Sequence, residues 1–315
     1  MYKLGVVGVG NMGKNHVRVI HRLYEEGYPV KLKAIMDVKE EYVKIYSKKY
    51  GCVGYTDFDK FSSLDLDGVV IATPTHIHDS TSIPLIENGV DLLIEKPLAH
   101  NSEAANRILE KAIENGVEIL VGHIERFNPS VRKLKELLEV GYGGNIISMS
   151  ARRVGPGMNY RVKKIGVTLD LAIHDIDIFH FLSGKEISEM EIYSGSMTPP
   201  YEYEDYSFVT VKLGDIIGSV ETNWLTPYKL RKLYVTGDRG VFELDYIEQR
   251  LIYAGNGGDT PIEIDVDKEE PLYLEHIHFL NILMRRERPE VDVNYAYNLI
   301  KKIEESRKTH IILKI

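Results

Sequence analysis

The sequence predicts an α/β domain with a parallel, doubly wound sheet, followed by an α+β domain with a large, mainly antiparallel, open-faced sheet. Three observations support this. Up to residue 122, short apolar runs alternate with helical patterns. A glycine-rich turn follows the first run, and beyond Pro129 the alternation gives way to successive strands rich in Tyr and Val. Alternating strands and helices form parallel sheets, whereas consecutive strands joined by tight turns form antiparallel ones. We therefore expect two domains, residues 1–122 and 123–315.

The first domain contains apolar runs of strand length, separated by segments with helical periodicity. Helices are expected at Lys39–Tyr50, Ile83–Asn88 and Ser102–Asn115. The last of these has Ser102 as its expected N-cap and Gly116 as its C-cap residue. Strands are expected at Lys3–Val7, Leu32–Met36, Gly68–Ala72, Leu92–Ile94 and Glu118–Val121.

The second domain is expected to be rich in hairpins. Leu213-Gly214-Asp215 and Asp238-Arg239-Gly240 have the composition of hairpin turns. Helices are expected at Ser130–Val140, Thr168–Leu182, Pro271–Arg286 and Tyr295–Thr309. Strands are expected at Asn145–Val154, Glu189–Ser196, Tyr206–Leu213, Ile217–Asn223, Arg231–Val235, Val241–Leu244 and Arg250–Ala254.

Composition narrows the class of protein. With 315 residues, 43% hydrophobic and 27% charged, the chain can form two ordinary globular cores. A net charge of −8 and the lack of a basic stripe argue against a nucleic-acid partner. No apolar stretch has the length of a membrane span, and the chain enters a strand at once, so neither a membrane partner nor a signal peptide is expected. The single Cys52 permits no internal disulfide and favours a cytoplasmic location.

The glycine-rich turn has the spacing Gly8-x-Gly10-x-x-Gly13 between the first apolar run and a helical segment. In a dinucleotide-binding βαβ unit, such glycines allow a tight turn, close approach to a pyrophosphate, and close packing of helix on strand. The loop residues expected to contact a dinucleotide are Gly8, Gly10, Asn11, Met12 and Gly13.

The second apolar run ends at Asp37, where such units carry an acidic residue. A carboxylate there accepts hydrogen bonds from the ribose hydroxyls of NAD and repels the 2′-phosphate of NADP. Lys39 is the one nearby cation that could weaken this repulsion, and we interpret it as a solvated charge at a helix start. The expected cofactor is NAD, with NADP less favoured.

Three polar loops follow later strands of the first sheet. They contain Thr73-Pro74-Thr75 with His78, then Glu95-Lys96-Pro97, then Arg126-Phe127-Asn128-Pro129. The carboxyl ends of strands in a doubly wound sheet form its ligand-binding edge, so these loops are expected there. A charged Glu95-Lys96 pair directly after a buried strand is hard to explain as core; the alternative is an ion pair that caps the sheet.

The second domain offers an acid–base pair. Asp170 and His174 are four residues apart, which places them on one face of a helix, within hydrogen-bonding reach. A carboxylate that orients an imidazole makes it a competent general base. Asp175 and Asp177 are expected as caps or surface charges. A metal site formed by these residues with His180 would lack a recognised ligand spacing, so no metal is expected.

Taken together, these motifs resemble the glucose–fructose oxidoreductase / inositol dehydrogenase / MocA (Gfo/Idh/MocA) family over essentially the whole chain. Glu95-Lys96-Pro97 is the most specific of them; the others include the glycine motif, Ala72-Thr73-Pro74 with His78, the Asp170/His174 pair, and Trp224 with Gly237-x-x-Gly240. The resemblance implies a Rossmann domain that binds NAD through the glycine loop and through Asp37, Thr73, Pro74, Thr75, His78, Glu95 and Lys96. Thr75 stands where the family pattern usually has Asn, and the Lys96-Pro97 bond is expected to be cis.

By the same resemblance, Lys96, Asp170 and His174 would be the catalytic residues of a sugar dehydrogenase. His174 would take the hydroxyl proton, and Lys96 would stabilise the developing alkoxide charge. Residues expected to line the substrate site are Arg126, Asn128, Arg152, Tyr160, Arg161 and His174. Because Arg152 and Arg153 alternate on a strand, only one of them can face that site.

The substrate and assembly are expectations of the same kind. Similarity to members acting on UDP-N-acetylglucosamine-type sugars favours a nucleotide sugar oxidised at its 3-hydroxyl, with a free cyclitol such as inositol as the alternative. A protein of another class, an NAD-binding sensor without turnover, stays open because fold does not fix function. The resemblance also implies a homodimer or homotetramer associated through its sheets.

Overall fold

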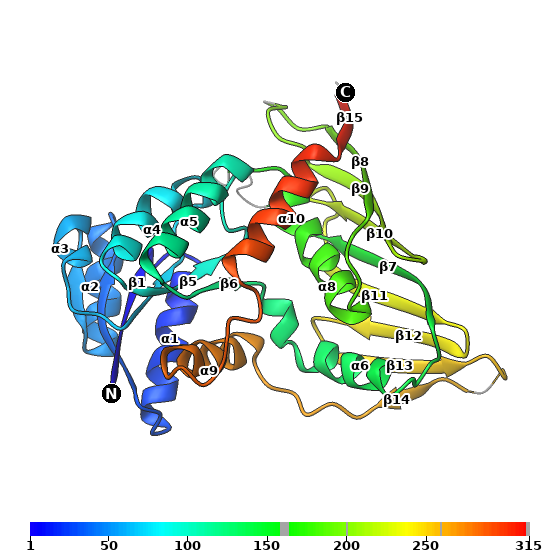
Figure 1. Ribbon diagram of the computed structural model, residues 1–315, viewed down its shortest axis with the longest axis horizontal. Helices are drawn as coiled ribbons and strands as arrows, with labels where there is room; N and C mark the ends of the chain where they lie inside the picture. The colour runs from blue at the N-terminus through cyan, green and yellow to red at the C-terminus, as the bar shows by residue number, and fades with distance from the viewer. Residues whose placement is uncertain (158–163, 200, 259, 313–315) are drawn as a thin grey trace. The chain divides into compact units, whose positions relative to one another are not determined.

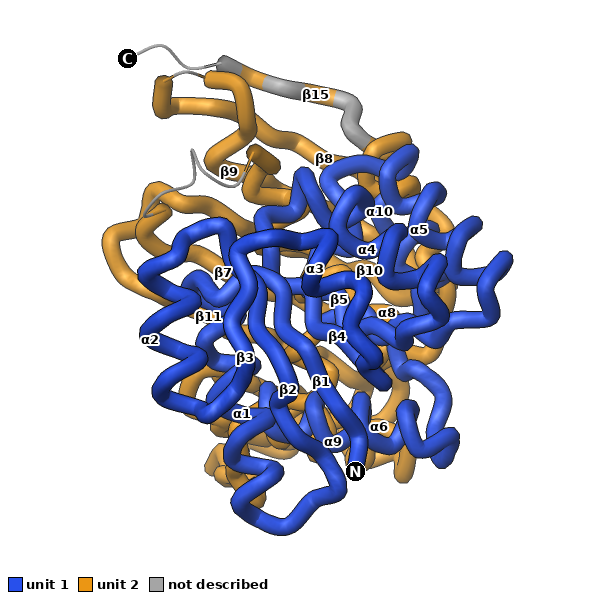
Figure 2. The backbone as a smooth tube through the Cα atoms, turned by 90° about the vertical axis from the view of Figure 1, so that its left-hand side faces the viewer, with its two compact units in different colours: residues 1–122, 272–300 blue, residues 123–271, 301–315 orange. Residues whose placement is uncertain are grey.

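The computed structural model describes residues 1–157, 164–199, 201–258 and 260–312. The chain divides into two compact units, coloured separately in Figure 2. The first unit contains Met1–Gly122 and Leu272–Ile300, and the second contains His123–Pro271 and Lys301–Ile315. The sequence predicted one boundary, after residue 122, and so placed residues 272–300 in the second domain.

The first unit is built on a parallel sheet of six strands within the described residues, in the order β3-β2-β1-β4-β5-β6. Every pairing between neighbours in this sheet is parallel. The order reverses between β1 and β4, which is the doubly wound arrangement that the sequence predicted. The strands are β1 (Tyr2–Val7), β2 (Val30–Met36), β3 (Val53–Tyr55), β4 (Gly68–Ile71), β5 (Asp91–Glu95) and β6 (Ile119–Gly122).

Helices connect these strands in alternation (Figure 1). One predicted cap is wrong: the α5 N-cap is Asn101, whose side chain accepts a hydrogen bond from Ala104 N at 2.8 Å, rather than Ser102. Gly116 does end this helix, with a φ of 63°. The helices are α1 (Gly13–Glu25), α2 (Glu40–Tyr50), α3 (Phe58–Ser62), α4 (His78–Glu87) and α5 (Ser102–Asn115), with a 3₁₀ turn η1 (Thr75–Ile77) before α4.

Helix α9 (Pro271–Leu283) belongs to the first unit because of what it packs against. A Cβ atom at Gly68 of β4 would lie 3.1 Å from both Phe279 and Leu283, so the bare glycine backbone admits the helix closely. The Arg22 guanidinium of α1 lies 3.8 Å from the centre of the Tyr273 ring. These contacts bury apolar surface of α9 against the first sheet, which its position late in the sequence does not suggest.

The second unit contains a sheet of nine strands within the described residues, in the order β14-β13-β12-β11-β7-β10-β9-β8-β15. Neighbouring strands in this sheet pair antiparallel, except that β7 pairs parallel with β10 and β8 pairs parallel with β15. The sheet is therefore mixed but mainly antiparallel, as predicted. The strands are β7 (Ile146–Val154), β8 (Glu189–Ser196), β9 (Tyr206–Leu213), β10 (Ile216–Asn223), β11 (Leu230–Gly237), β12 (Gly240–Asp245), β13 (Arg250–Gly255), β14 (Ile262–Ile264) and β15 (Arg307–Ile312).

The last helix is shorter than predicted. Helix α10 (Val293–Glu305) ends before Thr309, and residues 307–312 form the edge strand β15 instead. Strand β15 pairs with β8, which has no other neighbour on that side. Pairing with β15 provides hydrogen-bond partners for the backbone groups at the edge of β8. The helical pattern of the sequence does not indicate that this edge needs a partner strand.

Helices cover one face of the second sheet, where α6 (Pro129–Glu139) and α8 (Ile173–Ser183) lie on the same side in Figure 1. Burial alternates along β9 and along the inner part of β10, so one face is buried and the other is exposed. Two short turns, η2 (Ile124–Phe127) and the π-helical η3 (Thr168–Ala172), precede α6 and α8. The sheet is therefore open on one face. No helix within the described residues is both long enough and apolar enough to cross a membrane.

Candidate active site

The glycine loop of the first unit has the geometry of a dinucleotide site. Gly8 has a φ of +84°, and a Cβ there would lie 2.7 Å from the Ala72 carbonyl oxygen. A Cβ at Gly13 would lie 1.7 Å from the carbonyl oxygen of Gly8. By contrast, a Cβ at Gly10 would meet nothing within 4 Å. Gly8 and Gly13 are thus required by the turn itself, whereas Gly10 leaves an open approach to the backbone.

Helix α1 presents its N-terminus at this loop. Met12 occupies the N-cap position, and its side chain makes no capping hydrogen bond. Asn11, in the turn just before it, is exposed. Backbone N–H groups at an uncapped helix start bind anions well, because they have no intrahelical acceptors and lie at the positive end of the helix dipole. The loop therefore fits a pyrophosphate.

Asp37 is fixed beside the glycine loop, just after β2. Its Oδ2 accepts a hydrogen bond from Val9 N at 2.8 Å, and its Oδ1 accepts one from Lys39 N at 2.9 Å. Each carboxylate oxygen has a second lone pair, so both can still accept from ribose hydroxyls. The Lys39 ammonium lies 5.0 Å from the centre of the Tyr42 ring. Asp37 therefore stands where a carboxylate can select the ribose.

The loop after β4 is held by a buried histidine. Thr73 and Thr75 are half-buried and Pro74 is exposed, so these three residues can meet a ligand. His78 is 1% exposed, with Nε2 2.9 Å from the Thr73 carbonyl oxygen and Nδ1 3.2 Å from that of Pro97. Burial lowers the pKa of this imidazole. The ring of His78 thus joins two loops, and its expected contact with the cofactor stays a prediction.

Glu95 and Lys96 end the neighbouring strand β5. The Lys96-Pro97 peptide bond is cis, as expected, and the Lys96 side chain is half-buried. The Glu95 carboxylate lies 2.8 Å, Oε1 to Nε2, from His16 of α1. The sequence predicted a cofactor contact for Glu95 or, alternatively, an ion pair with Lys96. It did not suggest His16 as a partner.

In the second unit, Asp170 lies in the π-helical turn η3 and His174 in the first turn of α8. Both side chains are buried, and Asp170 Oδ2 accepts a hydrogen bond from Trp224 Nε1 at 3.3 Å. Trp224 follows the last residue of β10, so a residue at the end of this strand holds the Asp170 carboxylate. Local π-helical geometry is frequent at functional sites, which suits this position.

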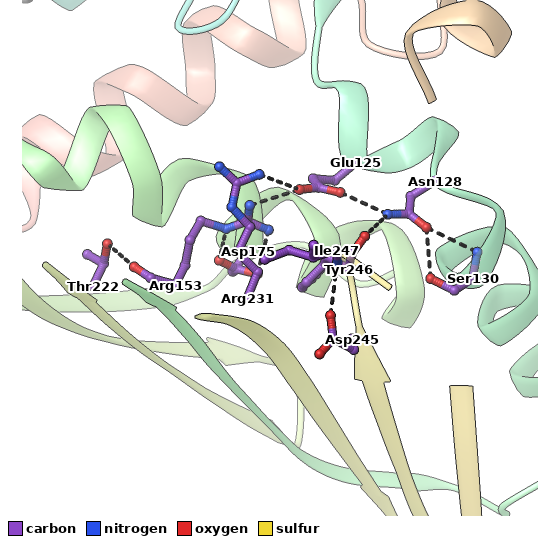
Figure 3. Close-up of polar contacts among 10 residues, drawn as sticks. All are labelled: Glu125, Asn128, Ser130, Arg153, Asp175, Thr222, Arg231, Asp245, Tyr246 and Ile247. Carbon is purple, nitrogen blue, oxygen red and sulfur yellow. Dashed lines mark hydrogen bonds and ion pairs between the residues drawn. The ribbon is translucent and has the colours of Figure 1, made fainter. Parts of the chain in front are cut away.

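Two charged residues that the sequence interpreted as caps or surface charges are buried instead. Asp175 is fully buried, and its Oδ2 accepts a hydrogen bond from Arg153 Nε at 2.6 Å. Arg153 also donates to Glu125 at 2.8 Å (Figure 3). Burial alone would lower the pKa of Arg153, but the charges of Asp175 and Glu125 outweigh it and raise that pKa. Asp177, the second of the two, is 1% exposed.

Arg126 is the partner of Asp177, and its expected role as a substrate contact stays a prediction. Its Nη2 lies 2.6 Å from Asp177 Oδ1, and its Nε lies 3.0 Å from Oδ2. Burial raises the pKa of Asp177, but the charges of Arg126 and His123 outweigh it and hold that pKa well below its usual range. The guanidinium is thus engaged in a buried ion pair.

Asn128 is also engaged in holding the fold. Its Oδ1 accepts a hydrogen bond from Ser130 N at 3.1 Å, which caps α6. Its Nδ2 donates to the Tyr246 carbonyl oxygen at 3.0 Å (Figure 3). The side chain is 1% exposed, and the expected substrate contact of Asn128 also stays a prediction.

Arg152 lies on the open face of the second sheet, away from the helices. Its Nε lies 2.9 Å from Glu221 Oε2 on β10. Arg153, the next residue, faces the covered side that carries His174, because side chains alternate along a strand. The expectation that Arg152 contacts substrate finds no support in this placement and stays a prediction. Tyr160 and Arg161, the remaining expected substrate residues, lie outside the described residues.

The sequence analysis missed Arg231, which lies on β11 directly opposite Arg153 of β7. In Figure 3 both guanidinium groups lie beside Glu125; the distance from Arg231 Nη1 to Glu125 Oε1 is 3.8 Å. Its side chain is 37% exposed, and its guanidinium makes no hydrogen bond among the described residues. Burial and repulsion by Arg153 lower its pKa, against the attraction of Glu125, Asp175 and Asp170. Only the pairing of β7 with β11 reveals this cation.

Within the described residues, no three His, Cys, Asp or Glu side chains are grouped as metal ligands would be. Among these residues, His123, His174 and His180 therefore form no such set of metal ligands with nearby Asp or Glu side chains.

Comparison with known proteins agrees with this geometry. Residues 2–123 match the oxidoreductase family with an NAD-binding Rossmann fold, and residues 131–243 match the GFO/IDH/MocA C-terminal domain. The uncharacterised oxidoreductase YrbE of Bacillus subtilis is 28% identical over 69% of this chain, and the matched part spans 62% of that protein. The scyllo-inositol 2-dehydrogenase (NAD(+)) of the same organism is 26% identical over 94% of this chain and 91% of its own length.

The UDP-N-acetylglucosamine 3-dehydrogenase of Acidithiobacillus ferrooxidans is 24% identical over 89% of this chain and 88% of its own length. The solved structure of that protein, GnnA, superposes with a TM-score of 0.84, covering 97% of this chain and 96% of GnnA at 21% identity. The structural likeness shows a shared fold. With both domains matched and the Rossmann loop geometry in place, the chain belongs to the Gfo/Idh/MocA family of NAD(P)-binding oxidoreductases.

Proposed function

We propose that the chain catalyses NAD-dependent oxidation of a secondary alcohol on a sugar, and the reverse reduction. One observation carries the proposal: the buried carboxylate of Asp170, held by Trp224, precedes His174 by one helical turn. A sensor protein has no use for a fixed acid–base pair, whereas removal of a hydroxyl proton needs one. The open backbone at Gly10 supports binding of a dinucleotide, and the fixed carboxylate of Asp37 supports NAD over NADP.

Each residue has a distinct proposed role. NAD, when bound, supplies the hydride acceptor. His174 takes the hydroxyl proton, and Asp170 orients the imidazole and supports its cationic form. The Lys96 ammonium donates a hydrogen bond to the same substrate oxygen as negative charge develops on it. Thr73, Pro74 and Thr75 contact the dinucleotide at the carboxyl end of β4.

For the substrate we propose a nucleotide sugar, such as a UDP-N-acetylhexosamine oxidised at its 3-hydroxyl. Support comes from the UDP-N-acetylglucosamine 3-dehydrogenase, which matches this chain over 89% of its length. Arg231 adds a half-exposed guanidinium on the covered face, with donors that can meet substrate oxygens.

A free cyclitol is the second candidate, and a specific observation favours it. Arg126, Arg152 and Arg153 each contact a carboxylate, so none of them offers an unbalanced positive charge to a diphosphate. A neutral polyol needs hydrogen bonds rather than net charge. The match to a scyllo-inositol 2-dehydrogenase over 94% of the chain agrees with this candidate.

The experiment is a panel of UDP-N-acetylhexosamines, free sugars and inositols, each with NAD and then NADP, scored by absorbance of the reduced cofactor. We expect turnover with at least one UDP-sugar. His174→Ala is the matched control, because it removes the proposed base and should bind NADH as the wild type does. Turnover on inositols alone would favour the second candidate. Tight NADH binding with no turnover on any compound would favour a sensor.

Lys96→Ala tests the proposed electrophilic group. Loss of one donor to a developing oxyanion costs about 10²–10³ in rate, so kcat should fall by that factor while NADH affinity stays within a few-fold. Stopped assays on the best panel substrate and fluorescence titration of NADH measure the two quantities. Near-wild-type kcat in this variant would assign Lys96 a structural role only.

A further inference from the structure

A buried chain of hydrogen bonds joins three distant parts of the first unit. His16 of α1, three residues after Gly13, contacts Glu95 at the end of β5 with Nε2 and Oε1 2.8 Å apart. On its other side, His16 Nδ1 lies 2.8 Å from His276 Nε2 of α9. His16 and His276 are 0% and 1% exposed, so solvent does not satisfy their ring nitrogens.

The chemistry of the three groups sets the direction of these hydrogen bonds. An ionised carboxylate only accepts, so His16 Nε2 donates its proton to Glu95. If His16 is neutral, its Nδ1 is an acceptor and His276 Nε2 donates to it. His276 Nδ1 then carries a bare lone pair, and it has no partner among the described residues. A cationic His16 would instead leave His276 with a buried N–H lacking an acceptor, which is rarer in proteins than an unsatisfied acceptor.

The surroundings of His276 disfavour a charge on its ring. Burial lowers the pKa of His276. Glu275, beside it on α9, is fully buried, and neither of its carboxyl oxygens has a partner among the described residues. Burial and the charge of Glu95 raise the pKa of Glu275 well above its usual range. Of these two carboxyl groups, Glu95 is the one that has a hydrogen-bond partner within the described residues, His16.

We propose that His16 is a positioning residue for the end of β5: it holds the Glu95 carboxylate through Nε2–H, and His276 fixes it in that tautomer. Glu95 ends β5 and Lys96 follows directly, so a fixed Glu95 side chain fixes the backbone from which Lys96 projects. The helix that follows the glycine loop is thereby linked to the strand end that carries the lysine. The proposal rests on the catalytic role proposed above for Lys96.

Kinetics on substitutions at His16 provide the first test. His16→Leu removes the donor to Glu95, and we expect kcat to fall by about 10- to 100-fold, since small misplacements of reacting groups cost up to about 10². KM for the sugar and the affinity for NADH should change by less than about threefold. His16→Gln, whose amide can donate to Glu95, should recover most of kcat.

Phe279→Leu is the matched structural control. It weakens the packing of α9 on Gly68 without touching the hydrogen-bonded chain, so it should lower the urea midpoint and leave kcat unchanged. Wild-type kcat in His16→Leu would overturn the proposal. So would equal losses of kcat in His16→Leu and Phe279→Leu, or a failure of His16→Gln to recover activity in a folded protein.

A second measurement needs no substrate. In the wild-type protein labelled with ¹⁵N-histidine, we expect two slowly exchanging imidazole N–H signals with the shifts of neutral Nε2–H tautomers. Conservative His16→Gln and His276→Gln variants assign them, each by loss of one signal. A cationic His16 or an Nδ1–H tautomer of His276 would overturn the proposal. If no panel compound is turned over, the proposed function fails. The imidazole signals still decide whether the hydrogen bonds among Glu95, His16 and His276 exist.

Discussion

Nearby carboxylates distinguish Arg126 and Arg153 from Arg231. A buried guanidinium without a partner is very costly, so Arg126 and Arg153 are each matched to a buried aspartate. Arg231 differs because its nearest carboxylate, Glu125, already accepts a hydrogen bond from Arg153. It therefore keeps donors for a ligand on the face that carries His174.

Arg231→Met tests this assignment. We expect KM for the sugar to rise by about tenfold or more, because a hydrogen bond from a charged donor contributes about 1.5–3 kcal/mol, with a smaller change in kcat. Steady-state kinetics on the best panel substrate measure both. Arg152→Met is the matched control on the opposite face and should leave KM unchanged. Equal effects of the two substitutions would contradict the role of Arg231.

We expect Asp37 to determine cofactor choice by both its charge and its position. Asp37→Asn keeps an acceptor for the Val9 N–H group but removes the charge that repels a 2′-phosphate. We expect weaker NADH binding, by about tenfold, and a smaller preference for NADH over NADPH. Fluorescence titration of both cofactors measures this. If the wild type binds NADPH more tightly, the interpretation of Asp37 is wrong.

At the scale of elements, helix α8 carries His174 and is held by two buried ion pairs. Asp175 meets Arg153 of β7, and Asp177 meets Arg126 of η2. The helix is therefore fixed against the sheet on one side and against the preceding turn on another. This explains why two aspartates directly after the proposed base are buried.

Asp177→Asn tests the second pair. Breaking a buried ion pair by removing one partner costs about 3–5 kcal/mol, so the urea midpoint at pH 7 should fall clearly. The pKa of Asp177 is depressed in the folded state, so its contribution is present above the usual carboxyl pKa and is lost as pH falls through the lower folded value. The wild type should thus lose stability with acid more steeply than the variant. Parallel curves from pH 7 down to acid unfolding would contradict this.

At the scale of the whole molecule, the open face of the second sheet favours self-association. Its exposed apolar side chains lie on four adjacent or nearby strands: Tyr193, Phe208, Ile217 and Tyr234. Their exposed fractions of 37–61% are large for bulky apolar residues on one face. Tyr193 and Phe208 pair directly across β8 and β9. Exposed apolar patches mark protein interfaces.

We expect a homodimer or homotetramer formed through this face. Light scattering at micromolar concentration should return a multiple of 35.9 kDa. Phe208→Glu should shift the mass toward the monomer, while Tyr228→Glu, which changes an exposed aromatic outside the strands, should not. A monomer mass for the wild type would rule the assembly out.

Much of the fold could be predicted from the sequence, because it depends on short-range patterns. Apolar runs alternating with helical segments predicted the parallel sheet, and successive strands joined by turns predicted the hairpins. The spacing of Gly8, Gly10 and Gly13 predicted the glycine loop, in which close contacts require glycine at positions 8 and 13. The positions of Lys96, Asp170 and His174 came from motifs and family resemblance. Alternation along β7 also predicted that Arg152 and Arg153 face opposite sides.

What the sequence could not supply is the partner of each buried polar group. The pairs Arg126–Asp177 and His16–His276 join residues far apart in the chain, and each exists because two elements pack together. Helix α9 is apolar on several sides, so its sequence does not say which core it joins. Periodicity reports which face of an element is buried, whereas only tertiary packing decides what covers that face. Packing therefore determined that Arg126 and Arg153 are engaged in buried ion pairs, whereas Arg231 stays partly exposed.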